Sequence, residues 1–160
     1  MKSNALVCLV ALSSVLPLAA ASRHAGNPVY PTYDGRVMAG YQGWFHNRSD
    51  GTMFKDENSV RIDMWPDVSE YEKTYPTGLK LSNGETARFF CSDDASTVET
   101  HFRWMEEYGL DGVFLQRFFG NATRPTPEGR EESVTVLRHA LAAAQKHGRA
   151  VSVMYDLSGL

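Results

Sequence analysis

Two short apolar runs of this 160-residue chain end directly in polar and aromatic side chains. Gln116 and Arg117 follow the first run, and Tyr155 and Asp156 follow the second. Aromatic rings pack on the apolar C–H faces of sugar rings, while carboxylate, amide and guanidinium groups bond to the surrounding hydroxyls. Side chains of these types at the ends of strands therefore favour a carbohydrate ligand.

Three aromatic residues nearer the N-terminus extend this set. Tyr41 and Trp44 end a predicted strand at 36–45, and Trp65 lies in an irregular stretch further along the chain. Trp44 and Trp65 have an alternative role as packing aromatics, since large rings are usually well buried. Arg117 fits a structural ion pair as readily as a ligand contact. The residues that we predict to bind substrate are Tyr41, Trp44, Trp65, Arg117 and Tyr155.

Asp156 is the predicted catalytic residue, because it directly follows a buried strand, where β/α-barrel enzymes hold their catalytic groups. Glycoside hydrolysis needs two carboxylates, so a single Asp156 also fits an orienting role. Asp93 and Asp94 fit better as anions at the start of a helix. We predict no metal and no cofactor, because the chain lacks HExxH, paired-cysteine, GxSxG and glycine-rich phosphate motifs.

A sequence pattern that occurs twice, at 108–118 and at 147–157, indicates the elements that position these side chains. In each copy a helical pattern ends at a glycine, Gly109 or Gly148, and a short apolar run follows. Such runs are typical of strands buried on both faces of a parallel sheet. Parallel α/β folds bind their ligands beyond the carboxyl ends of the strands.

The remaining patterns predict further elements. A second strand is expected at 86–91, after a loop at 74–85 that is rich in turn signals. Ser96 and Glu99 match a capping box for the first helix. The second helix starts near 126–128. Its predicted apolar face is formed by Val134, Leu137, Leu141 and Ala144.

Residues 1–21 form a predicted secretory signal peptide, with a basic start, an apolar run and a cleavage position near Ala21. A membrane anchor fits less well, because Pro17 interrupts the end of a run too short to span a bilayer. After cleavage only Cys91 remains, so we expect no intramolecular disulfide. The net charge of −3 does not favour nucleic acid, which binds basic patches. We therefore expect a secreted or extracytoplasmic protein with no nucleic-acid partner and, after cleavage, no membrane partner.

Several segments resemble secreted proteins of the glycoside hydrolase family 71/99-like group. These segments are 37–45, 62–71, 111–118 and 148–159. The block Trp65-Pro66-Asp67 is the most specific part. The resemblance implies a β/α barrel that acts on glycosidic bonds of a polysaccharide or glycan; family 99 includes endo-acting α-mannosidases and α-mannanases. It also implies that the paired catalytic glutamates belong to later strands, beyond residue 160.

We therefore predict an α/β fold, the N-terminal half of a (β/α)8 TIM-like barrel truncated after strand four, since a full barrel needs about 250 residues. The predicted organisation is a signal peptide at 1–21, an extended lead-in at 22–34 and a partial β/α-barrel domain at 35–160. The predicted function is that of a secreted glycoside hydrolase-like protein, of which this chain is an incomplete fragment. Two alternatives stay open: a non-catalytic carbohydrate-binding protein derived from such an enzyme, and a small complete α/β domain with another ligand.

Overall fold

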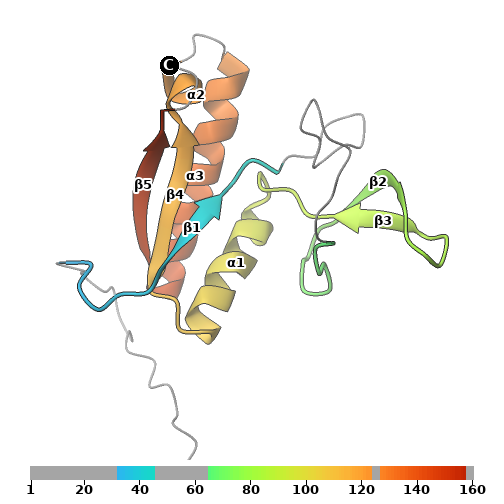
Figure 1. The fold of residues 1–160 in the computed structure, drawn as a ribbon, viewed down its shortest axis with the longest axis horizontal. Helices are drawn as coiled ribbons and strands as arrows, with labels where there is room; N and C mark the ends of the chain where they lie inside the picture. The colour runs from blue at the N-terminus through green and yellow to red at the C-terminus, as the bar shows by residue number, and fades with distance from the viewer. Residues whose placement is uncertain (1–31, 46–64, 124–126, 158–160) are drawn as a thin grey trace, which may run out of the picture.

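The computed structural model describes residues 32–45, 65–123 and 127–157 (Figure 1). The predicted signal peptide and most of the predicted lead-in lie outside the described residues. The elements in chain order are β1 (Met38–Gln42), β2 (Tyr75–Lys80), β3 (Thr86–Phe89), α1 (Ala95–Glu107), β4 (Gly112–Phe118), α2 (Phe119–Thr123), α3 (Pro127–His147) and β5 (Ala150–Asp156). No helix within the described ranges has both the length and the apolar content needed to cross a bilayer.

Three strands form a parallel sheet in the order β1-β4-β5, so that β4 lies at the centre. Gly112 of β4 lies opposite Met38 of β1 and Ala150 of β5, so the three strands start at one level. Glycine is required there, because a Cβ at Gly112 would overlap the backbone of Ala150. Strands β2 and β3 form a separate antiparallel ribbon, which projects away from the sheet in Figure 1.

Helices α1 and α3 pack on one face of the parallel sheet and form the main core with it. Val98 and Phe102 of α1 meet Val113 and Leu115 of β4, and all four side chains are at most 2% exposed. Burial of such side chains stabilises the fold by about 1.5–3 kcal/mol each. Helix α3 contributes mainly small residues to this core, namely Val136, Ala140, Ala143 and Ala144.

The expected N-terminal half of a (β/α)8 barrel is wrong. The segment 86–91, predicted as the second barrel strand, contributes β3, which pairs antiparallel with β2 and not with the parallel sheet. Strand β2 itself occupies much of the segment 74–85 that we predicted as a loop. Its side chains alternate between half-buried and exposed, and Gly84 turns the chain with φ of 86°, so local geometry favours a hairpin. The observed fold is a small α/β unit with a three-stranded parallel sheet and a two-stranded ribbon.

The two helix–glycine–strand units predicted from the repeated sequence pattern are confirmed. Gly109 and Gly148 have φ of 77° and 62°, the left-handed conformation that follows the ends of α1 and α3. The strands expected after them, at 113–116 and 150–155, are present as the longer strands β4 and β5.

The predicted capping box at the start of α1 is wrong, because the helix begins before Ser96, at Ala95. Asp94 takes the N-cap position without a side-chain capping bond. Its carboxylate instead accepts a hydrogen bond from the Tyr75 hydroxyl at 2.9 Å, which ties the ribbon to the helix. This bond raises the pKa of Tyr75 to about 12, because it favours the protonated phenol beside an anion.

The predicted apolar face of α3 is confirmed only in part, since Ala144 lies in the core and Leu137 packs against it, but Leu141 does not. Leu141 is 52% exposed, while Val136 and Ala140 are buried. The chain after β1 passes so close to α3 that a Cβ at Gly43 would overlap the side chain of Val136. Close approach to the sheet therefore favours small side chains at the centre of the buried face of α3 and leaves Leu141 at the surface.

Asp111 joins the starts of all three parallel strands. Its N–H donates to the Val37 carbonyl at 2.8 Å, its carboxylate accepts the Val37 N–H at 2.9 Å, and its carbonyl accepts the Ala150 N–H at 2.8 Å. Arg36 Nη1 lies 3.4 Å from the second carboxylate oxygen. The Val37 bond, followed by the charge of Arg36, holds the pKa of Asp111 below its usual range, so the carboxylate stays ionised.

Asp111→Ala is expected to lower the free energy of unfolding by about 2 kcal/mol, because it leaves the Val37 N–H without its charged acceptor. Asp67→Ala is the matched control, since Asp67 also accepts a backbone N–H, from Ser69 at 3.0 Å, but on an exposed local turn. Denaturant unfolding at neutral pH measures both values. An equal loss in the two variants would contradict a special role for Asp111.

Candidate functional site

The carboxyl edge of the parallel sheet brings together two polar side chains from neighbouring strands. Gln116 of β4 donates from Nε2 to Oδ2 of Asp156 of β5 at 2.7 Å. Both side chains are partly buried, which holds the carboxylate in one orientation. The amide oxygen of Gln116 remains an acceptor in this arrangement, since only its NH2 group donates to Asp156.

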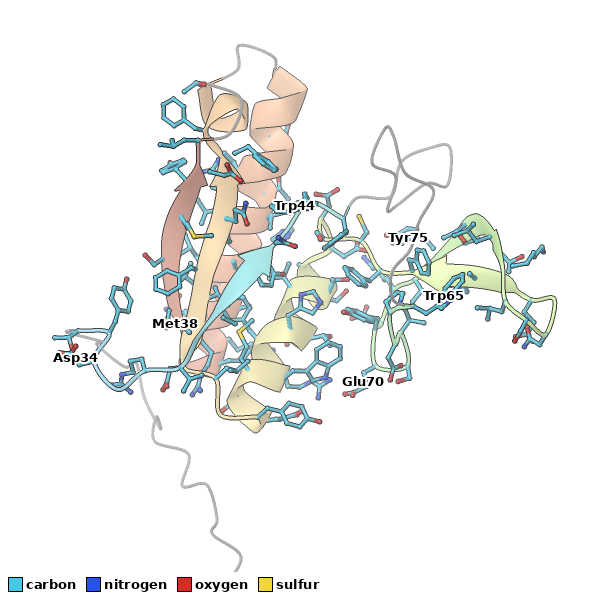
Figure 2. All side chains as sticks on the ribbon, viewed as in Figure 1. Asp34, Met38, Trp44, Trp65, Glu70 and Tyr75 are labelled. Atoms are coloured by element: carbon cyan, nitrogen blue, oxygen red, sulfur yellow. The ribbon has the colours of Figure 1, made fainter. Side chains whose placement is uncertain are left out.

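Two aromatic rings lie beside this polar pair. Phe118 lies opposite Asp156 in the β4–β5 register, and its ring centroid is 5.2 Å from that of Trp44. Trp44 follows β1 and is half-buried, so part of its ring remains accessible. Trp44, Gln116, Phe118 and Asp156 form what we call the carboxyl-edge cluster, of which Trp44 is labelled near the end of β1 in Figure 2.

The carboxyl-edge cluster belongs to the face of the sheet that α1 and α3 do not cover. Successive side chains of a strand point to opposite faces. Val113 and Leu115 point into the core with the helices, so Gln116 and Phe118 belong to the opposite face. Asp156 shares that face because it is the register partner of Phe118. The cluster therefore lies on the face of the sheet that no described helix covers.

Arg117 and Tyr155 lie at the same edge but on the helix-covered face. They are register partners on β4 and β5. Tyr155 is 50% exposed, and its ring meets Phe119 of α2 at 6.0 Å in an edge-to-face arrangement. The structure thus brings two of the predicted binding residues next to each other, on the other side of the edge from Gln116.

Tyr41 lies in the core and not at the open edge. It is 7% exposed, and its hydroxyl lies 2.9 Å from Nδ1 of His101 on α1. The Tyr71 hydroxyl lies 2.6 Å from Nε2 of the same ring. A neutral imidazole has one donor and one acceptor nitrogen, so one hydroxyl donates to it and the other accepts from it. The predicted sugar-binding residue Tyr41 therefore takes part in a buried Tyr41–His101–Tyr71 network.

Burial sets the proton affinities in this network. Desolvation lowers the pKa of His101 to about 4, because the imidazolium would lose its hydration among Tyr71, Phe90 and Trp104. Desolvation also raises the pKa of Tyr41 and of Tyr71. All three groups are neutral near pH 7, as a structural network requires. His101 is thus a structural histidine, with a hydroxyl partner at each of its two ring nitrogens.

Trp65 lies beside the β2–β3 ribbon and apart from the carboxyl-edge cluster (Figure 2). Its ring packs on Phe89 of β3 with centroids 5.7 Å apart, and the residue is 48% exposed. Trp65 therefore has the packing role that the sequence analysis left open for it. Trp44, in contrast, lies at the edge of the parallel sheet. The two tryptophans do not belong to one site in the described structure.

A hollow lies between residues 69–72 and the first turns of α1. Three of its charged residues are paired: Arg103 contacts Glu70 at 2.7 Å and Glu107 at 2.8 Å, and Glu99 contacts Lys146. Among the described residues no group of three or more His, Cys, Asp or Glu side chains could hold a metal ion. The carboxyl-edge cluster is therefore the stronger candidate site.

Of the carboxyl-edge cluster, the sequence analysis had singled out Trp44, Gln116 and Asp156, but it missed Tyr71 as a partner of His101. These two residues are 30 positions apart, and neither belongs to a recognisable motif. No family model, no curated protein and no solved structure matches this chain. The resemblance to the glycoside hydrolase family 71/99-like group stays a prediction.

His101 should make the protein less stable as the pH falls from about 6.5 towards 4. The folded protein holds a neutral His101 with a pKa near 4, whereas the unfolded chain protonates this residue near 6.5. The unfolded state therefore binds more protons in this window, and stability is lost on acidification by up to about 3 kcal/mol.

Denaturant unfolding at pH 7 and at pH 4.5 measures this effect in the wild type and in His101→Gln. The variant keeps a polar side chain but removes the titration, so its stability should depend less on pH across the window. An NMR titration of the His101 ring provides a second measurement. A folded-state midpoint near 6.5 would contradict the burial that the structure describes.

Proposed function

We propose that this chain is a secreted protein that binds carbohydrate at the carboxyl-edge cluster. The observation that carries the proposal is the ring of Trp44 against Phe118, directly beside the Gln116–Asp156 hydrogen bond. An indole ring offers an apolar platform for the C–H face of a pyranose, and the amide and carboxylate oxygens accept bonds from its hydroxyls. Secretion is proposed from the sequence of residues 1–21.

Electrostatics supports a neutral, hydroxyl-rich ligand over an anionic one. Asp156 is the ionisable member of the cluster, and the uncharged amide of Gln116 donates a hydrogen bond to one of its carboxylate oxygens. A negatively charged ligand would meet the carboxylate and be repelled. A sugar diol, in contrast, supplies donors without net charge, which suits the acceptors at this edge.

Hydrolysis of glycosidic bonds is the second candidate function, favoured by the fixed carboxylate of Asp156 and by the sequence resemblance. General acid–base cleavage needs two carboxyl groups, about 5 to 9 Å apart, around the scissile bond. The carboxyl-edge cluster as defined has one. Binding is therefore the function that the geometry supports best, with hydrolysis as the further activity to be tested.

Trp44→Ala is expected to weaken oligosaccharide binding by at least about tenfold, which corresponds to about 1.4 kcal/mol. Trp65→Ala is the matched control, because it removes the same ring from the ribbon and leaves the sheet edge intact. Calorimetric titration with a panel of neutral oligosaccharides measures the affinities, and circular dichroism checks that each variant folds. Equal loss in both variants, or no binding by the wild type to any member of the panel, would contradict the proposal.

Asp156→Asn separates binding from hydrolysis. The amide keeps the shape of the side chain but cannot act as an acid, a base or a nucleophile. If the protein only binds glycans, no reducing ends appear with either form, and the Asp156→Asn variant retains most of the affinity. Release of reducing ends by the wild type that is abolished in Asp156→Asn would establish the hydrolase instead.

A further inference from the structure

Among the described residues, the outer edge of β5 presents a row of backbone groups with which no other strand pairs. β5 pairs with β4 on one side, and no strand of the described residues pairs with its other side. The Ala150 N–H points towards β4, because it donates to the Asp111 carbonyl at 2.8 Å. Backbone groups of successive residues alternate between the two sides of a strand. The N–H and C=O groups of Val151, Val153 and Tyr155 therefore point outward.

Exposed apolar side chains accompany this row. Val153 is 38% exposed, Met154 41%, Tyr155 50% and Leu157 60%. Soluble proteins usually protect an edge strand with lysine, proline or a bulge. β5 contains no lysine and no proline, and its register with β4 runs without a shift from Ala150 to Asp156. The strand thus has the features of an edge that pairs with another strand.

We propose that the outer edge of β5 is a homodimer interface, at which β5 pairs antiparallel with β5 of a second copy around a two-fold axis at Val153. This register uses the outward groups of Val151, Val153 and Tyr155 in both copies. It is isologous, so one surface serves both subunits and the assembly closes as a dimer. The three-stranded sheets of the two copies would then form one continuous sheet.

The sequence of β5 is complementary to itself in this register. Tyr155 lies opposite Val151 of the partner subunit, and Met154 lies opposite Ser152 of the partner subunit. Large side chains therefore face small ones across the interface. Asp156, the only charged residue of β5, lies opposite Ala150 of the partner subunit, so the two carboxylates stand at opposite ends and do not repel each other. This self-complementarity favours a second copy over an unrelated strand.

Amide hydrogen exchange on the wild-type protein at low and high concentration provides the first test. The amides of Val151, Val153 and Tyr155 should exchange at least about tenfold more slowly where the dimer dominates. The amides of Ser152 and Met154 point to β4, so they are the internal control and should be protected at both concentrations. Concentration-independent exchange of the three outward amides would overturn the proposal.

Val153→Lys provides the second test, because it places two lysines opposite each other on the two-fold axis. Leu81→Lys is the matched control: Leu81 is also 38% exposed but lies at the turn of the ribbon. Sedimentation equilibrium should show a dimer for the wild type and for Leu81→Lys, and a dissociation constant at least about tenfold higher for Val153→Lys. A monomeric wild type at all concentrations, or a dimer that Val153→Lys does not weaken, would overturn the proposal.

Discussion

The hydrogen bonds of Asp111 set the level at which all three parallel strands begin. Its backbone and carboxylate fix Val37 before β1, and its carbonyl fixes Ala150 at the start of β5. Since parallel strands advance by equal steps, a common start also aligns their far ends. The hydrogen bonds of Asp111 at the opposite edge therefore lead to the pairing of Phe118 with Asp156. That pairing in turn permits the hydrogen bond between Asp156 and Gln116.

The helices cover only one face of the parallel sheet, and this determines which surfaces remain for binding. α1 and α3 bury the face that carries Val113 and Leu115. Parallel sheets are usually covered on both faces, so the face that carries Gln116 and Phe118 is unusual in having no described helix over it. Its side chains at the carboxyl edge are polar and aromatic, in keeping with a ligand site. The β2–β3 ribbon does not take the place of a helix on this face, because it packs around its own small cluster of Ala87, Phe89 and Cys91.

The sequence predicted the parts of the fold that depend on local signals. Gly109 and Gly148 marked the helix ends, and the apolar runs after them marked β4 and β5. The ribbon was missed because the segment before Gly84 alternates only weakly, and the turn signals there outweighed it. The candidate site was partly predictable, since Trp44 follows β1 and Asp156 is the last residue of β5. The partners of Tyr41 and Asp111 depend on contacts 60 and 74 residues away, which no local pattern encodes.

Strand β5 serves the proposed glycan site and the proposed dimer through different groups. The Asp156 side chain turns towards Gln116 on β4, whereas the outward backbone groups belong to Val151, Val153 and Tyr155. Antiparallel pairing would also point the carboxyl edges of the two sheets in opposite directions. Each carboxyl-edge cluster would then stand at its own end of the joined sheet, so a dimer could engage two separate glycan chains without either site blocking the other.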